Sequence, residues 1–331
     1  MRIKPRFWVL IGLIVAVVIV VGWFTLQVDP IFAGRGREVA ITVKEGDSVS
    51  TIGGELAAKG VIASSFAFHL DNFLFGSVVL HPGVYELRQG SSFSHIRFIL
   101  SSPEVTASPG LTLHEVALEV AAAEGDGYAD EFVKAATAAV TPSPYGHGSS
   151  LEGLIGDTTY LITPTTTPQE LAGEMVDGFE REAKSAGLTP ATTINGLDAY
   201  QLITAASIVV KEGYYPLSNY PKVARVIFNR LADGGPLQMD STVLYYLGQD
   251  GGTVTPAMLK VRTPYNTYLN TGLTPTPICT VSEAALHAVL HAPAGSWLYF
   301  EVVNKDGKEA FSTTFAQQLA EEKLAQSRGL G

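Results

Sequence analysis

Hydrophobic and polar positions change their spacing along the chain, and each spacing predicts a different kind of element. Residues 7–26 form an unbroken apolar run without a charged side chain. Apolar positions recur at helical spacing over residues 168–186, 197–212 and 221–231, whereas they alternate on both sides of a turn within residues 297–313. These patterns predict a membrane-spanning helix, three further helices and a C-terminal β-hairpin. The expected fold class is therefore α+β.

A strand-turn-helix pattern recurs in the first third of the chain. In each copy a glycine turn leads to a serine or threonine, and an amphipathic helix follows. The hydroxyl group of such a residue accepts a hydrogen bond from a backbone N–H of the first helical turn, so it caps the helix. Units of this kind suit a small α+β module. The three pairs of turn and cap residues are Gly46 and Ser48, Gly90 and Ser92, and Gly110 and Thr112.

The apolar run of residues 7–26 is long enough to cross about 30 Å of hydrocarbon. Arg2, Lys4 and Arg6 precede it, so the positive-inside rule predicts a cytoplasmic N-terminus and an exported remainder. A cleaved signal peptide is the alternative. Its apolar region is normally about 7–15 residues long and ends at an Ala-x-Ala-like site, which the sequence lacks. The sequence therefore predicts an uncleaved, single-pass anchor in the cytoplasmic (plasma) membrane.

Charge and chemistry exclude several classes of protein. The formal net charge is −10 and there is no basic stripe to neutralise phosphates, which argues against a nucleic-acid partner. Cys279 is the only cysteine, so no intrachain disulfide is possible and a small buried thiol is expected. His287 and His291 have the spacing of a zinc helix, but alanine replaces the usual glutamate and no third ligand is evident. We therefore expect no metal site.

The predicted surroundings of Glu212 disfavour ionisation of its carboxyl group. On the expected helix over residues 197–212 it shares a face with Ile208 and Val209, and Gly213 ends the helix directly after it. An apolar face and the negative end of a helix dipole both favour the protonated form. A neutral glutamic acid near pH 7 is what general-acid catalysis needs. The alternative is a solvated glutamate at a frayed helix end.

Several motifs follow one another from this helix towards the C-terminus. An Ala-Ser-Ile-Val-x-x-Glu segment ends at Glu212, and after it come Asn-Arg-Leu (229–231), Leu-Gln-Met-Asp-Ser-Thr-Val (237–243) and Tyr-Asn-Thr-Tyr (265–268). In this order the motifs resemble the YceG-like (MltG) family of endolytic peptidoglycan transglycosylases. The resemblance covers most of the chain after residue 40 and is strongest over residues 205–314. Several motifs in a fixed order are far more specific than any one of them.

The resemblance implies an enzyme that cleaves the β-1,4 bond between N-acetylmuramic acid and N-acetylglucosamine within nascent peptidoglycan strands, which would end their elongation. It implies that Glu212 is the catalytic residue, as acid and then as base, and that the product carries a 1,6-anhydro end. No metal or other cofactor is expected. The implied partners are peptidoglycan glycan strands, the membrane and, as a candidate, a peptidoglycan synthase.

The expected division of the chain follows from the anchor and the resemblance. Residues 38–103 are expected to be a LysM-like module that contacts glycan, for which a noncatalytic packing role is the alternative. The full division is residues 1–6 (cytoplasmic), 7–27 (transmembrane helix), 28–37 (linker), 38–103 (LysM-like module) and 104–331 (YceG-like catalytic domain).

The expected substrate-binding residues carry amide, hydroxyl, carboxyl or aromatic groups, which suit N-acetylated sugars. The carboxyl and aromatic residues have structural alternatives: a turn contact for Asp240, half-buried packing for the tyrosines, and a helix or turn partner for Glu152. The set is Glu152, Asn229, Gln238, Asp240, Thr242, Tyr265, Asn266 and Tyr268.

The sequence also departs from the family pattern. Val210 stands where many relatives have a second acidic or amide residue, which leaves Glu212 as the only candidate in its helix. An expected aspartate falls on Thr158, and two histidines common in relatives fall on Glu309 and Gln318. The departures at Thr158, Glu309 and Gln318 favour one alternative, a noncatalytic glycan-binding or scaffold protein. A separate alternative is a hydrolase that uses a second carboxylate such as Asp240.

Overall fold

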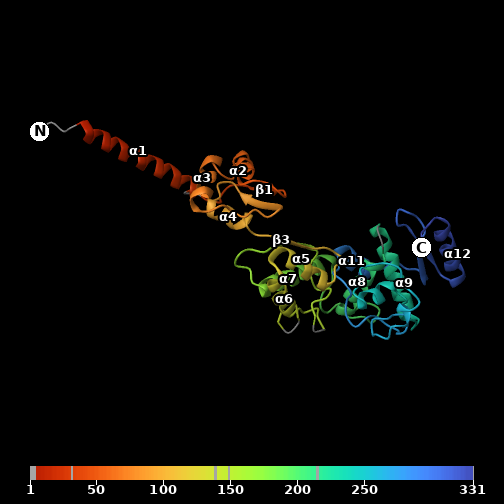
Figure 1. Cartoon of the computed structure of the whole chain (residues 1–331). Coiled ribbons are helices and arrows are strands. Elements are labelled where there is room, and N and C mark those ends of the chain that lie inside the picture. The colour runs from red at the N-terminus through yellow and green to blue at the C-terminus, as the bar shows by residue number, and fades with distance from the viewer. Residues whose placement is uncertain (1–4, 31–32, 138–139, 148–149, 214–215, 331) are drawn as a thin grey trace. The chain divides into compact units, whose positions relative to one another are not determined.

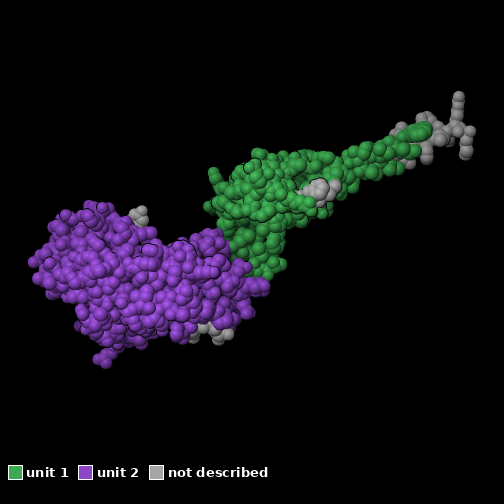
Figure 2. Space-filling model, turned by 180° about the vertical axis from the view of Figure 1, so that it is seen from behind, with its two compact units in different colours: residues 1–105, 161–166 green, residues 106–160, 167–331 purple. Residues whose placement is uncertain are grey.

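A computed structural model describes residues 5–30, 33–137, 140–147, 150–213 and 216–330. The chain divides into two compact units, which Figure 2 shows in different colours. The first unit contains Met1–Val105 and Leu161–Thr166, and the second contains Thr106–Tyr160 and Thr167–Gly331. Helices and short two-stranded sheets occur in both, so the α+β fold class is confirmed.

The N-terminal helix α1 (Pro5–Val28) contains the apolar run (Figure 1). It is long and apolar enough to cross a membrane, and its window Ile11–Val28 has a mean hydropathy of 2.5 with no fully buried residue. Phe24 and Val28, at its C-terminal end, pack against the core of the first unit. Arg2 and Lys4 lie outside the described residues, so the orientation of the helix stays a prediction from the sequence.

The first unit has a two-stranded antiparallel sheet on one side of its core and helices on the other. Its elements are β1 (Glu38–Val43), α2 (Val49–Ala58), α3 (Ser65–Phe75), β2 (Gly83–Arg88) and α4 (Phe93–Leu100). Ile41 of β1 pairs with Tyr85 of β2, and both side chains are buried against Phe68 and Phe93 of the helices. The LysM-like character of this unit stays a prediction.

The repeated strand-turn-helix pattern is confirmed. Ser48, Ser92 and Thr112 each accept a hydrogen bond from a backbone N–H of the following helix. The turn glycines before them all have positive φ, which an L-residue adopts only with strain. Each copy therefore stops a strand and starts a helix by the same local chemistry.

The second unit is mostly helical. Glu104–Ala107 (β3) pairs with Thr158–Leu161 (β4), and the chain passes between the two units within these strands and once more after Thr166. The other elements are α5 (Leu113–Glu124), α6 (Asp126–Ala135), α7 (Pro168–Ala186), α8 (Ala199–Glu212), η1 (Leu217–Asn219), α9 (Tyr220–Ala232), α10 (Asp240–Tyr246), η2 (Met258–Lys260), α11 (Glu283–Leu290), β5 (Tyr299–Val302), β6 (Glu309–Ser312) and α12 (Phe315–Ser327).

The predicted helices and hairpin of this unit are confirmed. Helix α7 has the predicted bounds, and α9 exceeds them by one residue at each end. Helix α8 begins two residues late, because Asp198 is its N-cap and accepts a hydrogen bond from the Gln201 N–H. Strands β5 and β6 pair antiparallel, with Val302 opposite Glu309.

Helix α8 is the buried centre of the second unit and contacts α9, α10 and α11 (Figure 1). Its side chains are buried from Leu202 to Val209. Ser207 Oγ accepts a hydrogen bond from the Ile278 N–H at 3.0 Å, and the Cys279 Sγ–H points to the Ser207 carbonyl oxygen at 3.3 Å. Burial raises the pKa of the Cys279 thiol. This cysteine is therefore the small buried thiol that the sequence predicts.

Helix α9 holds the C-terminal hairpin in place. Asn229 Nδ2 donates hydrogen bonds to the carbonyl oxygens of Gly295 and Trp297 at 3.1 and 2.8 Å. Arg230 Nε donates to the Leu298 carbonyl oxygen at 2.6 Å. These bonds fix the loop that enters β5, and α12 packs on the other side of the hairpin. The hairpin thereby becomes one wall of a cavity whose opposite wall includes the end of α8.

Two glycines of α7 give a test of this packing. A Cβ at Gly178 would overlap the Tyr160 hydroxyl, whereas a Cβ at Gly173 would meet nothing within 4 Å. Both substitutions by alanine gain helix propensity, worth about 1 kcal/mol. We therefore expect Gly173→Ala to stabilise the second unit by about 0.5–1 kcal/mol and Gly178→Ala to destabilise it by about 1–3 kcal/mol. Urea unfolding of the full-length protein in detergent measures both, and equal shifts would show that α7 does not approach Tyr160 as described.

Candidate active site

Glu212 joins the end of one helix to the start of another. It is the last residue of α8 and is half-buried. Ser241, in the first turn of α10, donates two hydrogen bonds to Glu212 Oε1, from Oγ at 2.6 Å and from the backbone N–H at 3.1 Å. Among the described residues, no hydrogen bond reaches Oε2. The carboxyl group is therefore held by one oxygen, and it is not simply a solvated group at a frayed helix end.

The pKa of Glu212 is raised above its ordinary value, and burial is the main cause. The nearby Asp240 carboxylate raises it further, whereas the two bonds from Ser241 and the Arg230 guanidinium lower it. Two helix dipoles also act on the pKa of Glu212, because α8 ends at this point and α10 begins there. The C-terminal end of α8 favours the protonated form, and the N-terminal end of α10 favours the carboxylate. The direction of the shift is the one that the sequence predicts.

Glu212 opens onto a cavity of about 550 Å³. The α8 and α10 side of the cavity contributes Glu212, Arg230, Gln238 and Asp240, and the hairpin and α12 contribute Tyr299, Glu309 and Gln318. Arg230 lies over the Tyr299 ring, 5.2 Å from its centroid, and also donates to the Leu237 carbonyl oxygen. Carboxyl groups, two amides and aromatic rings thus surround one space, which suits a hydroxyl-rich ligand.

Three of the predicted substrate-binding residues line this cavity with Glu212. They are Gln238, Asp240 and Tyr268. Tyr268 Oη donates a hydrogen bond to Asp240 Oδ1 at 2.5 Å, and burial together with this carboxylate raises the pKa of Tyr268. Gln238 has φ of +51°, and its backbone N–H donates to the Thr267 carbonyl oxygen at 3.0 Å. Such a conformation is strained for glutamine, and strain of this kind clusters at functional sites.

Three other predicted residues do not line the cavity and bond within the protein. Thr242 Oγ1 donates to the Met239 carbonyl oxygen at 2.7 Å and lies 2.9 Å from Thr267 Oγ1. Asn266 Nδ2 donates to the carbonyl oxygens of Leu259 and Val261 at 3.0 and 2.8 Å. Asn229 holds the loop before β5, as described above. As substrate contacts they stay predictions, while their bonds shape the loops around the cavity.

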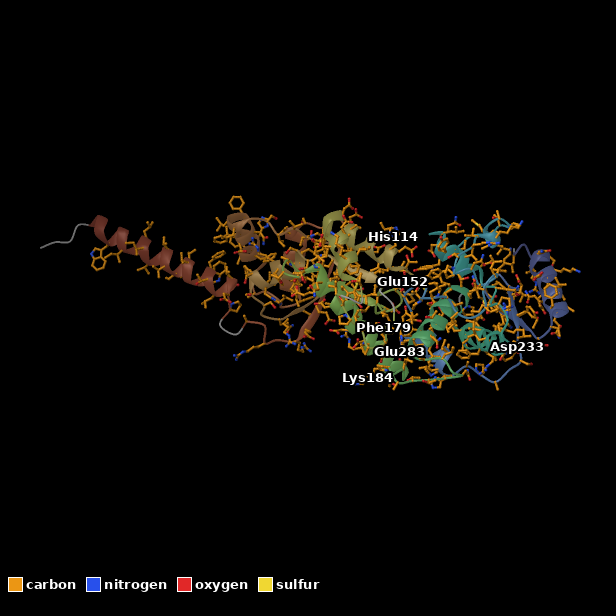
Figure 3. The ribbon with its side chains drawn as sticks, turned by 90° about the horizontal axis from the view of Figure 1, so that it is seen from below. His114, Glu152, Phe179, Lys184, Asp233 and Glu283 are labelled. Carbon is orange, nitrogen blue, oxygen red and sulfur yellow. The ribbon has the colours of Figure 1, made fainter. Side chains whose placement is uncertain are left out.

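Glu152 and Tyr265 lie outside this cavity. Glu152 is buried and accepts hydrogen bonds from the Leu113 N–H at 3.0 Å and from Tyr245 Oη at 3.0 Å. It lines a smaller cavity with His114, near which Figure 3 shows it, and burial raises its pKa to about 7. The Tyr265 ring packs 5.2 Å from that of Tyr245. Their substrate-binding roles also stay predictions.

Glu309 and Gln318 are cavity residues that sequence reasoning treated only as lost histidines. Glu309 is 5% exposed, and neither of its carboxyl oxygens has a hydrogen-bond partner among the described residues. Burial, with smaller contributions from Glu212 and Glu301, raises the pKa of Glu309 to about 8. The only signal in the sequence was that both positions depart from the family pattern. The cavity therefore holds, besides Glu212, another buried carboxyl group whose pKa is raised.

Arg230 and Ser241 are also absent from the predicted set, although both stand within the quoted motifs. Arg230 is the middle residue of Asn-Arg-Leu, and Ser241 follows Asp240. Motif membership was available from the sequence, but their bonds to the hairpin loop and to Glu212 depend on tertiary contacts.

Comparison with known proteins shows the family of the chain. The model of the YceG-like family matches residues 41–323. The chain belongs to the YceG-like family. An endolytic murein transglycosylase from Bacillus subtilis (strain 168) is 27% identical to this YceG-like chain over 329 residues, which cover 91% of the chain and 88% of the relative.

Two further similarities extend the comparison. An endolytic murein transglycosylase from Streptococcus pneumoniae (strain D39) is 26% identical over 315 residues, which cover 84% of this YceG-like chain but only 57% of that relative. The crystal structure of a YceG-like protein from Listeria monocytogenes has a TM-score of 0.59 and 24% identity, and the match covers 86% of this chain and 98% of that one. This structural similarity shows the shared fold.

The buried Glu309 carboxyl group predicts a pH-dependent stability. Because its pKa of about 8 lies above the unfolded value of about 4.3, the folded state binds more protons between these values, and stability falls as pH rises through that window. The limiting slope from one group is about 1.4 kcal/mol per pH unit. We expect Glu309→Gln to melt at a higher temperature than the unmodified chain at pH 8 and at a similar temperature at pH 4.5.

Thermal unfolding at several pH values, with the exposed Glu119→Gln as the control of equal charge change, measures this difference. Glu152 and Glu182, whose pKa values burial raises to about 7, keep their own contributions in all three proteins. A constant difference between Glu309→Gln and the unmodified chain across the pH range would mean that Glu309 is ionised as freely as a surface carboxylate.

Proposed function

We propose that this protein is a lytic transglycosylase that cleaves peptidoglycan glycan strands internally, at the β-1,4 bond between N-acetylmuramic acid and N-acetylglucosamine. The observation that carries the proposal is a half-buried glutamic acid with a raised pKa that opens onto a cavity lined by polar and aromatic groups. The names of the curated relatives, endolytic murein transglycosylases, support the substrate and the type of reaction.

The proposed reaction has two proton transfers through one carboxyl group. Protonated Glu212 gives its proton to the glycosidic oxygen as the bond from that oxygen to C1 of N-acetylmuramic acid breaks, and the N-acetylglucosamine part leaves as an alcohol. The C6 hydroxyl group of the same muramic acid then attacks C1, and the Glu212 carboxylate takes its proton. The product is a 1,6-anhydro end, and the catalyst returns to its starting state.

An intramolecular nucleophile explains why one carboxyl group suffices. The C6 hydroxyl group is already attached to the reacting sugar, so its effective concentration is high and no positioned water is needed. A hydrolase needs a second carboxylate to activate water or to attack the sugar. In this proposal Asp240 holds the Tyr268 hydroxyl and Glu309 is mainly a hydrogen-bond donor, so neither is assigned the role of a second catalytic carboxylate.

The neighbours of Glu212 have separate roles in this proposal. Ser241 fixes Oε1, and so it aims the carboxyl group into the cavity. Arg230 favours the carboxylate that remains after the first proton transfer. Protonated Glu309 is a hydrogen-bond donor without a partner among the described residues, which suits an acetamido or hydroxyl oxygen of the sugar.

We also propose that α1 is a single-pass anchor with its N-terminus inside the cell. Its length and mean hydropathy support a membrane span, and the basic residues before it support this orientation. The catalytic unit would then face newly made glycan outside the cytoplasmic membrane. A peptidoglycan synthase, as the source of such strands, is the candidate protein partner.

Replacement of Glu212 tests the reaction. We expect Glu212→Gln to lower the rate of cleavage by at least about 100-fold, because glutamine has no proton to give. Uncrosslinked glycan strands are incubated with full-length protein in detergent, and the products are weighed by mass spectrometry. Anhydro-ended fragments are lighter than hydrolytic fragments by one water. Glu124→Gln is the matched control, since Glu124 also ends a helix before a glycine but is exposed.

The products separate the alternatives. Anhydro ends that disappear with Glu212→Gln support the proposal. Reducing ends would show hydrolysis, and strands left intact by the folded, unmodified chain would show a noncatalytic binding or scaffold protein.

Replacement of Ser241 tests the control of the Glu212 pKa. The Ser241 hydroxyl stabilises the carboxylate, so Ser241→Ala should raise the pKa of Glu212. Because the reaction needs the protonated acid, the fall of kcat/KM with rising pH should move to higher pH. Ser241→Thr keeps the hydroxyl donor and should leave the fall of kcat/KM at the same pH as in the unmodified chain. If kcat/KM falls at an unchanged pH in Ser241→Ala, the fall reports the titration of another group, such as Glu309.

A further inference from the structure

Helix α3 of the first unit turns an apolar face outward. Phe66, Phe73 and Leu74 lie on that face and are 67%, 81% and 55% exposed. Directly after them, Phe75 and Val79 are 68% and 64% exposed. These five residues, here called the aromatic face, form one exposed apolar surface on α3 and the turn that follows it. Contiguous exposed apolar surfaces of this kind mark interaction sites in stable proteins.

Core packing and hydrogen bonds fix the position of the helix that carries the aromatic face. The opposite side of α3 is buried, including Phe68 in the core of the unit. Asn72 Oδ1 accepts a hydrogen bond from the Val78 N–H at 2.9 Å, which holds the turn after the helix. Arg97 of α4 donates to Asp71 Oδ2 and to the Gly76 carbonyl oxygen, both at 2.6 Å. These hydrogen bonds hold the C-terminal end of α3 on its polar side, while the phenyl rings of the aromatic face stay exposed.

The position of α3 points to what covers this face. Helix α1 contacts α3, and Figure 1 shows α3 beside the C-terminal end of α1. Phe24 and Val28 of α1 pack against the core of the same unit. If α1 crosses the membrane, its last turns lie at the bilayer surface, and α3 lies there with them. The apolar surface of α1 and the aromatic face are then parts of one compact unit at one membrane surface.

The chemistry of the face fits lipid better than sugar or water. Its five residues contribute only phenyl rings and aliphatic groups, so it offers no side-chain donor or acceptor to hydroxyl groups of a glycan. His69 is the titratable residue on the outward side of α3. Outward-facing phenylalanine and leucine on an amphipathic helix are what interfacial helices insert into the boundary between headgroups and acyl chains.

We propose that the aromatic face of α3 is a second membrane contact, which inserts into the lipid leaflet on the exported side. The proposal rests on the proposed anchor role of α1. Phe66, Phe73 and Phe75 enter the boundary between headgroups and acyl chains, while the outward face of the β1–β2 sheet, on the other side of the core, stays in water. The first unit is thereby held against the membrane rather than suspended from α1 alone.

Depth-dependent quenching in a bilayer tests the contact. Full-length protein is placed in vesicles of phosphatidylethanolamine and phosphatidylglycerol, with a share of the lipids carrying a nitroxide near the top of the acyl chain. A bimane fluorophore is attached to a cysteine introduced as Phe73→Cys, Val18→Cys or Glu86→Cys. Cys279 is buried and does not compete for the label. Val18 reports on the anchor, and Glu86 alternates with the buried Tyr85 and Leu87 on the outward side of β2.

We expect nitroxide lipids to quench the label at position 73 at least about threefold more than the label at position 86, as for an inserted interfacial helix. Adding Phe66→Ser and Phe75→Ser to Phe73→Cys should reduce this quenching, because the neighbouring rings no longer enter the lipid. Both added substitutions are at exposed positions, and an unchanged melting temperature shows that the unit still folds.

The outcomes distinguish this inference from the anchor. Quenching at position 18 with equally weak quenching at positions 73 and 86 would overturn the membrane contact and leave the anchor standing. Absence of quenching at all three positions would overturn both. The label at position 73 could instead be shielded from water to a degree that rises with the amount of protein per lipid and does not respond to nitroxide lipid. A second copy of the chain would then cover the face, which also overturns the proposal.

Discussion

Helix α8 is buried from Leu202 to Val209, so packing on several sides fixes its position. Its last residue cannot move far from the point where the buried stretch ends. That residue is Glu212, and Ser241 meets it there from the first turn of α10. The carboxyl group is consequently held between two helix ends of opposite polarity, at the edge of the core. Its raised pKa follows from this placement, because burial outweighs the bonds that favour the charged form.

The cavity beyond Glu212 is assembled from parts that are distant in sequence. Arg230 and Asn229 tie α9 to the loop before β5, and this tie brings Glu309 opposite the end of α8. Glu212 and Glu309 are two of the carboxyl groups that line this cavity, and the charge of Glu212 raises the pKa of Glu309, so their titrations are coupled. A site of this kind favours a state with at least one proton available, which an acid catalyst needs before each turnover.

The sequence identified Glu212 as the candidate acid because helix period, neighbouring apolar residues and the following glycine are all local properties. It named Gln238, Asp240 and Tyr268 through their motifs, and these residues do line the same cavity. It did not separate them from Thr242 and Asn266 in the same segments. Whether a side chain in a loop faces a cavity or bonds to its own backbone depends on the fold of that loop, which no spacing rule reports.

What the sequence determined by itself is part of the set of elements, with ends that are right to within about two residues. The apolar run of α1, the capped helices, the glycine turns and the hairpin follow from periodicity and from single residues such as Ser48 and Asp198, because these act within a few positions of the chain. Only the tertiary structure decided that Glu309 enters the cavity and that α3 faces outward. Both depend on contacts across the fold, from α9 to the loop before β5 and from Arg97 to α3. Long-range contacts of this kind produce no periodic pattern of apolar and polar residues in the sequence.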